Sequence, residues 1–176
     1  MLKRVALAVV LASLMPALAL AHGPTRQKVT QSIEINAPAD KVWAAIGKFQ
    51  DMGWTGYFTK TEGKGDNADG ATRTLTLAKG GMTEEKLNKY SADGMSYAYE
   101  ISKVDVKVLP LENFSSTLSV KGDAAKSTVE WKGAFYRGYA NNDPPPELSD
   151  EAAVAAVTEM FKSSLENLKK KLEAGG

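Results

Sequence analysis

The sequence has no cysteine and a single histidine, His22, and these absences exclude several classes of chemistry. Without cysteine there are no disulfides, no thiolate nucleophile and no thiolate metal ligands. A Ser-His-Asp triad needs a histidine held inside the fold, whereas His22 lies close to the beginning of the chain. A copper site at His22 would need a second strong ligand, and there is no other histidine. We therefore expect no metal, no cofactor and no nucleophilic triad.

The sequence also lacks an excess of charge of either sign, with 22 basic and 21 acidic side chains among 176 residues. Nucleic-acid-binding proteins usually carry a marked basic excess, so this balance argues against a nucleic-acid partner. Gly63-Lys64-Gly65 lacks the strand–loop–helix setting of a phosphate-binding loop. No internal repeat is visible.

The first residues have the three parts of an export signal. Lys3 and Arg4 precede an apolar run over residues 5–20, which ends in Ala19-Leu20-Ala21. This pattern predicts a signal peptide over 1–21, cleavage after Ala21 and release into the periplasm with no membrane attachment. The alternative is a retained anchor, which the shortness of the run and Pro16 disfavour. Residues 22–176 would then form a single domain.

The last stretch predicts one long amphipathic helix over residues 149–172. Ser149 is a good N-cap after three prolines, and Lys169 to Lys171 suit the negative end of the helix dipole. The apolar residues that recur at steps of three or four are Val154, Val157, Phe161, Leu165, Leu168 and Leu172. A helix of this length needs a large apolar surface to lie on.

The intervening residues predict that surface: a strand near Val29–Ile35, a short helix after Pro38 and about six further strands. The predicted buried face of the short helix consists of Val42, Trp43, Ile46 and Phe49, and residues 63–70 are predicted to form a polar loop. Turn signals such as Gly80-Gly81 separate successive strands and favour antiparallel hairpins. The stretches 105–113 and 137–148 are expected to be irregular; the second is either an ordered loop or a mobile lid. This order predicts an α+β fold in which a curved antiparallel sheet wraps around the long helix.

Several stretches occur in an order similar to that of a known superfamily. They are residues 33–43, Trp54, 70–73, Glu85 with Leu87, 95–99, 109–110 and 128–131. The chain resembles the Bet v 1-like or START-like superfamily, also called SRPBCC, and within it the polyketide cyclase/dehydrase-type branch. With His22-Gly23-Pro24 after its signal, it resembles the periplasmic MxaD family of bacterial methanol-oxidation systems. The resemblance implies a helix-grip fold with a deep cavity, and members that bind apolar or amphipathic ligands, only some of which are enzymes.

Arg73 and Glu85 are candidate site residues because each lies on the apolar side of its predicted strand. The Gly80-Gly81 hairpin would make them opposite or diagonal neighbours, and buried charges need partners. They are either a polar handle for a ligand head group or a structural ion pair. Tyr97, Tyr99, Trp131 and Phe135 also alternate inward and are either core or cavity wall. We predict a ligand-binding cavity bounded by these four aromatic residues, with Arg73 and Glu85 at its polar end.

Three functions are compatible with the sequence. The resemblance implies a non-enzymatic periplasmic accessory protein that aids the interaction of methanol dehydrogenase with its cytochrome c acceptor. The cavity of the fold suggests instead a carrier or sensor of a small hydrophobic ligand. The third function is a cyclase- or hydratase-type enzyme with Arg73 and Glu85 as acid/base groups. An ion-paired glutamate is held ionised and is a poor general acid near neutrality, which disfavours the enzyme.

Overall fold

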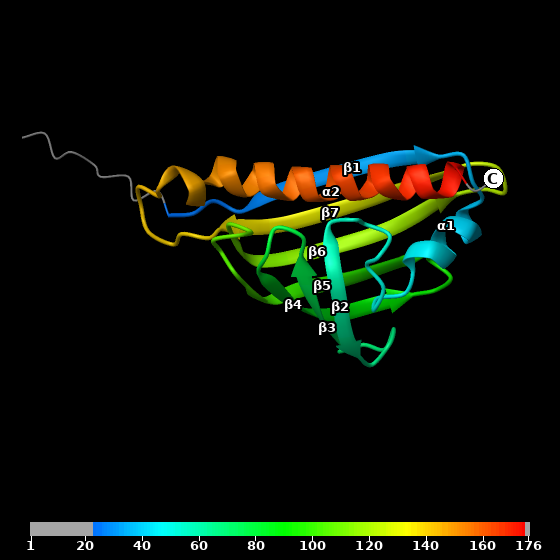
Figure 1. Cartoon of the computed structure of the whole chain (residues 1–176), viewed down its shortest axis with the longest axis horizontal. Coiled ribbons are helices and arrows are strands. Elements are labelled where there is room, and N and C mark those ends of the chain that lie inside the picture. The colour runs from blue at the N-terminus through cyan, green and yellow to red at the C-terminus, as the bar shows by residue number, and fades with distance from the viewer. Residues whose placement is uncertain (1–22, 175–176) are drawn as a thin grey trace, which may run out of the picture.

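The computed structural model describes residues 23–174, so the predicted signal peptide and His22 lie outside the described residues. The chain forms a seven-stranded antiparallel sheet, a short helix and a long C-terminal helix (Figure 1). The elements are β1 (Gln27–Ile35), α1 (Ala39–Ile46), β2 (Phe58–Lys64), β3 (Thr72–Leu77), β4 (Met82–Ser91), β5 (Ser96–Val104), β6 (Leu111–Gly122), β7 (Ser127–Arg137), the 3-10 turn η1 (Pro146–Leu148) and α2 (Asp150–Glu173).

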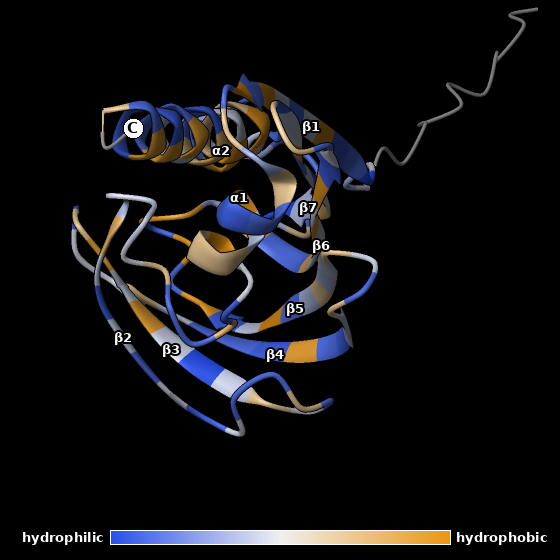
Figure 2. Ribbon diagram, turned by 90° about the vertical axis from the view of Figure 1, so that its right-hand side faces the viewer, coloured by the Kyte–Doolittle hydropathy of each residue, from blue (hydrophilic) through white to orange (hydrophobic). Residues whose placement is uncertain are grey.

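The strand order is β1-β7-β6-β5-β4-β3-β2, so every sequential hairpin from β2 to β7 is formed and β1 closes against the last strand. Figure 2 looks almost along α2 and shows the sheet curving from β1, beside the helix, round to β3 and β2. The helix lies mainly on β1 and β7. The predicted α+β, helix-grip architecture is confirmed.

Helix α2 begins where the sequence predicts. The Ser149 hydroxyl accepts a hydrogen bond from the Ala152 N–H at 3.1 Å, and Asp150 and Glu151 occupy the first turn. From Ala153 to Leu168 the helix buries one face, whereas Val154 and Leu172, which the periodicity places on that face, are only partly buried. The buried residues are Ala153, Val157, Met160, Phe161, Ser164, Leu165 and Leu168.

The other end of α2 makes polar contacts with the end of β1 and with the loop between α1 and β2. The Lys169 ammonium donates to the Glu34 carbonyl and the Lys171 ammonium to the Gly53 carbonyl, each at 2.7 Å. The Asn167 amide donates to the Trp54 carbonyl at 2.7 Å. The helix is therefore held by polar contacts as well as by its apolar face.

Some predicted boundaries are wrong. β2 continues to Lys64, so that Gly63 pairs with Arg73, where a polar loop from residue 63 was predicted. β6 begins at Leu111, inside the stretch predicted to be irregular. Trp43 is only partly buried, because α1 covers just the end of the sheet and the indole packs beside Tyr90. Within residues 23–174, no helix has the length and apolar character needed to cross a membrane.

Candidate functional site

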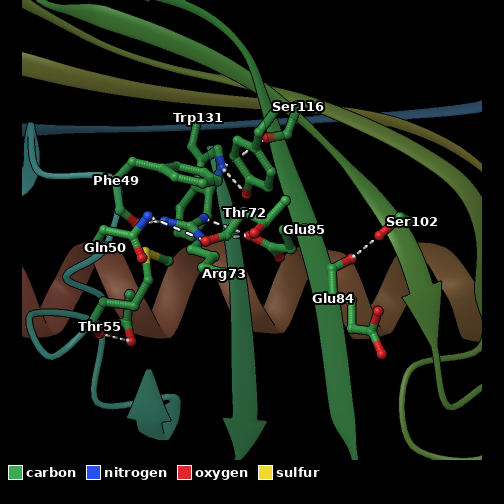
Figure 3. Close-up of polar contacts among 12 residues, drawn as sticks. Phe49, Gln50, Thr55, Thr72, Arg73, Glu84, Glu85, Ser102, Ser116 and Trp131 are labelled. Carbon is green, nitrogen blue, oxygen red and sulfur yellow. Dashed lines mark hydrogen bonds and ion pairs between the residues drawn. The ribbon is translucent and has the colours of Figure 1, made fainter. Parts of the chain in front are cut away.

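Arg73 and Glu85 form a buried ion pair on the inner face of the sheet (Figure 3). They are directly opposite in the β3–β4 ladder, as the hairpin predicts. The Arg73 Nε donates to Glu85 Oε2 at 2.7 Å, and Nη2 lies 2.6 Å from the same oxygen. Both side chains are almost fully buried, with 0% and 4% of their surfaces exposed. The carboxylate is thus engaged by two nitrogens of one guanidinium.

The loop after α1 completes the surroundings of Arg73. The Arg73 Nη1 donates to the Phe49 carbonyl. The guanidinium also lies 4.0 Å from the centre of the Phe49 ring and 4.9 Å from that of Tyr99. Such contacts stabilise a cation by the negative faces of the rings. Asn67 positions this loop, because its side-chain oxygen accepts from the Phe49 N–H at 2.8 Å.

Burial shifts the pKa values of groups in this cluster. Desolvation raises the pKa of Glu85 above its ordinary value, and the contact with the Arg73 guanidinium opposes that shift. The expectation from the sequence that the ion pair holds Glu85 ionised therefore omits burial, which has the larger effect and raises the pKa. Burial also raises the pKa of the Tyr99 hydroxyl, so that it stays protonated throughout the ordinary pH range.

Trp131 contacts several of the other buried residues beside the ion pair. Its indole N–H is shared between the Ser116 hydroxyl at 2.9 Å and the Tyr99 hydroxyl at 3.2 Å. The Ser116 hydroxyl in turn donates to the Lys132 carbonyl at 2.7 Å. The indole also packs against Trp54, with ring centres 5.5 Å apart. Trp131 therefore joins strands β5, β6 and β7 to the loop after α1.

Phe135 and Phe114 fill the space next to Trp131. Their rings stack with centres 6.0 Å apart, and Phe114 meets the edge of Phe161 from α2. Gly133 allows this packing, because a Cβ there would lie 3.1 Å from both the Phe114 and the Phe161 rings. A side chain at this inward position of β7 would compete with those rings for space.

All six predicted site residues thus meet in one interior region, each no more than 4% exposed. The residues are Arg73, Glu85, Tyr97, Tyr99, Trp131 and Phe135. Phe49 and Phe161 pack among them; the sequence placed both in the core but gave no signal for the role of the Phe49 carbonyl. Ligand binding by this cluster stays a prediction.

Hollows of about 300 Å³ lie at the surface of the protein. One of about 290 Å³ lies on the outer face of the sheet, over Lys28, Ala98 and Lys132. Another of about 310 Å³ lies beside the end of β5, lined by residues that include Ile101, Val104, Val106 and Glu112. Within residues 23–174 no three His, Cys, Asp or Glu side chains gather as a metal site would require.

The chain is similar in sequence and in fold to known proteins. A family model described as polyketide cyclase/dehydrase and lipid transport matches residues 26–173. The structure of the protein XoxI from Bacillus cereus is similar, with 27% identity and a TM-score of 0.68 over 83% of this chain and 95% of that one. No curated protein matches the sequence significantly.

Two enzymes share the fold at lower identity. The ZhuI aromatase/cyclase from Streptomyces sp. R1128 is 15% identical, with a TM-score of 0.68 over 85% of this chain and 94% of that one. Norcoclaurine synthase from Thalictrum flavum, solved with dopamine and hydroxybenzaldehyde, is 14% identical, with a TM-score of 0.62 over 97% and 99%. At these identities the similarity concerns the fold alone.

Proposed function

Because this chain belongs to the polyketide cyclase/dehydrase and lipid transport family, whose fold serves more than one kind of function, we propose that it acts by binding and not by catalysis. It is a periplasmic accessory protein of methanol oxidation. Its role is to aid the interaction of methanol dehydrogenase with its cytochrome c acceptor. The predicted signal peptide over residues 1–21 supports the periplasmic location.

The observation that supports a non-enzymatic role is the burial of Arg73 and Glu85. A general acid or base must reach the proton that it transfers, directly or through one water. Here the Glu85 carboxylate is held by Arg73, and the Phe49 and Tyr99 rings cover the guanidinium. This arrangement supports a structural role for the pair and disfavours the cyclase or hydratase alternative.

The methanol-oxidation role is supported by the resemblance of the exported chain to the MxaD family. The sequence has no cysteine, hence no C-x-x-C-H haem attachment motif, and one histidine. Electrons would therefore pass between dehydrogenase and cytochrome, while this protein promotes or stabilises their encounter. A protein that acts in this way changes a rate without being oxidised or reduced itself.

The test is a reconstitution with purified components. Residues 22–176 are added to methanol dehydrogenase and its cytochrome c, and cytochrome reduction is followed optically. We expect a faster rate when both partners are limiting and little change when both are saturating. An unrelated protein of similar size and charge controls for crowding. An unchanged rate, together with no binding to either partner, would overturn the proposal.

A second candidate function, the carrier of a small hydrophobic ligand, is supported by two observations. The family description includes lipid transport. The buried indole N–H of Trp54 and the buried hydroxyl of Ser164 have no hydrogen-bond partner within residues 23–174, and such groups are rarely left unpaired. Native mass spectrometry of the exported protein separates the two functions, since a carrier retains a small molecule that an adaptor lacks. An apolar fluorescent dye should bind to a carrier, and Trp131→Ala should weaken that binding.

A further inference from the structure

The two irregular stretches of the sequence meet at one end of the molecule. The loop between β5 and β6 and the loop between β7 and α2 (residues 138–149, yellow to orange in Figure 1) are joined where the Gly138 N–H donates to the Pro110 carbonyl at 2.9 Å. Gly138 also lies against Val106, because a Cβ at Gly138 would be 3.1 Å from the Val106 Cβ. We call the two loops, residues 105–110 and 138–149, together with the first turn of α2, the loop end.

Arg137 holds the longer loop in one conformation. Its Nε donates to the Tyr139 carbonyl and its Nη2 to the Asn141 carbonyl, each at 2.9 Å, while Nη1 lies 3.0 Å from Asp150 at the start of α2. The Arg137 side chain is only 7% exposed. One side chain therefore contacts both the beginning and the end of the loop. The loop is ordered in advance, which lowers the entropy cost of binding a partner.

Apolar surface of β5 and β4 borders the loop end. Pairing between β5 and β6 stops at Glu100 and Ser115, so the hairpin opens and leaves the groove that Ile101, Val104 and Val106 line. Met82 borders a second groove beside Val104 and, at 58%, is the only exposed large apolar side chain within residues 23–174. Apolar surface that is exposed next to polar residues often marks a protein interface.

The charge of the loop end is negative. Residues 138–151 contain four carboxylates and no lysine or arginine. Asp150 is paired with Arg137, but the exposed side chains of Asp143, Glu147 and Glu151 form no ion pair with any residue of 23–174. Lys103 is paired with Glu84. The other nearby cations are Lys107 and Arg26, which lies over the Tyr136 ring and donates to the Ser115 hydroxyl, so carboxylates still predominate. A partner that fits this surface presents lysine and arginine around an apolar centre.

We propose that the loop end is the docking surface of this protein and that it binds a basic protein surface. The proposal rests on the accessory function, and it specifies both the place of contact and the chemistry of the partner. Arg137 is a positioning residue, because it holds the loop while Asp143, Glu147 and Glu151 attract the partner.

The test compares two triple variants for binding to methanol dehydrogenase and to its cytochrome c by surface plasmon resonance over a range of salt concentrations. D143N/E147Q/E151Q removes the charges of the loop end. The matched control, D66N/D69N/D93N, removes three exposed carboxylates from loops at the opposite end of the sheet. We expect the first variant to lower the association rate by about tenfold at low salt, since electrostatic steering changes such rates by about 10- to 1,000-fold. The control should bind like the native protein.

Each outcome decides one of the two proposals. If the native protein binds and both triple variants bind equally well, the docking surface is wrong and the accessory function stands. If the native protein binds neither partner, the accessory function is wrong and the docking surface fails with it. D150N tests the positioning role, because it should speed amide hydrogen exchange in residues 138–149 and weaken binding without changing its salt dependence. Unchanged hydrogen exchange in residues 138–149 would show that the Arg137–Asp150 pair does not position the loop.

Discussion

The indole of Trp131 stacks on the ring of Phe161, with ring centres 4.3 Å apart and planes inclined by 14°. Trp131 belongs to β7 and Phe161 to α2, so this pair joins the sheet to the helix that covers it. Both side chains are at most 1% exposed. Stacked aromatic pairs contribute about 0.5–1.5 kcal/mol beyond the burial of their surfaces.

We predict that Phe161→Ala lowers the free energy of unfolding by about 3–5 kcal/mol, as expected for loss of a buried aromatic ring. Chemical denaturation followed by tryptophan fluorescence measures the change, since Trp131 reports directly on the site. Lys162→Ala, at the next, exposed position of α2, is the control and should be close to neutral. A loss well under 1 kcal/mol for Phe161→Ala would contradict the packing described.

Substitution of either residue of the buried Arg73–Glu85 pair should lower the free energy of unfolding strongly. Arg73→Met and Glu85→Leu each leave one charge buried without its partner, and each should cost about 3–5 kcal/mol. The double variant should cost clearly less than the sum, because it removes both charges. Equilibrium denaturation of the three variants gives the coupling energy.

The neighbouring pair Lys103–Glu84 supplies the control for that cycle. Its side chains are 74% and 50% exposed, and the corresponding substitutions should cost at most about 1 kcal/mol. Additive effects at Arg73 and Glu85 would show that the two side chains do not act together.

Gly133→Ala should destabilise the protein by about 1–3 kcal/mol, the usual cost of adding atoms to a filled core. The added methyl group would press on the Phe114 and Phe161 rings. Gly23→Ala is the control, because a Cβ at Gly23 has nothing within 4 Å. Thermal unfolding by circular dichroism distinguishes them, and equal transitions would imply that the core has room at Gly133.

Asp123 should contribute stability above acid pH and lose it on acidification. Hydrogen bonds from the Ala125 and Lys126 N–H groups, at 2.8 and 3.0 Å, lower the pKa of its carboxyl group. Because the folded pKa lies below the unfolded one, the contribution is complete above the unfolded pKa and disappears as pH falls through the folded pKa. The deficit of Asp123→Ala relative to the native protein should therefore shrink on acidification, as measured by denaturation at several pH values. A titration of Asp123 by NMR at or above the ordinary carboxyl range would contradict this assignment.

The sequence predicts the elements of the site well where they follow local periodicity. Alternation along β3 and β4, with a Gly80-Gly81 turn between them, is enough to place Arg73 opposite Glu85. The same reasoning places Tyr97, Tyr99, Trp131 and Phe135 inside. These positions depend on side-chain direction within a strand, which has a period of two and needs no knowledge of distant residues.

Contacts between distant segments could not be predicted in the same way. The Phe49 carbonyl binds Arg73, but every residue has a carbonyl, so no pattern marks this one as an acceptor. The sequence left residues 137–148 open between an ordered loop and a mobile lid, because the answer depends on Arg137 reaching Asp150 at the other end of the loop. Trp43 was predicted to be buried because a helix face was visible, while the extent of the sheet beneath that face was not.

The pairing of β1 with β7 has a consequence for the order of folding. Gln27 lies opposite Phe135 and Ile35 opposite Ser127, so the strand that is synthesised first acquires its only neighbour about a hundred residues later. Closure of such a long loop is slow compared with the formation of local hairpins. Until β7 emerges, β1 has an open edge on both sides, and until α2 follows, the inner face of the sheet lies bare. The native sheet and its covering helix therefore cannot be completed until β7 and α2, which lie in the last fifty residues, have been synthesised.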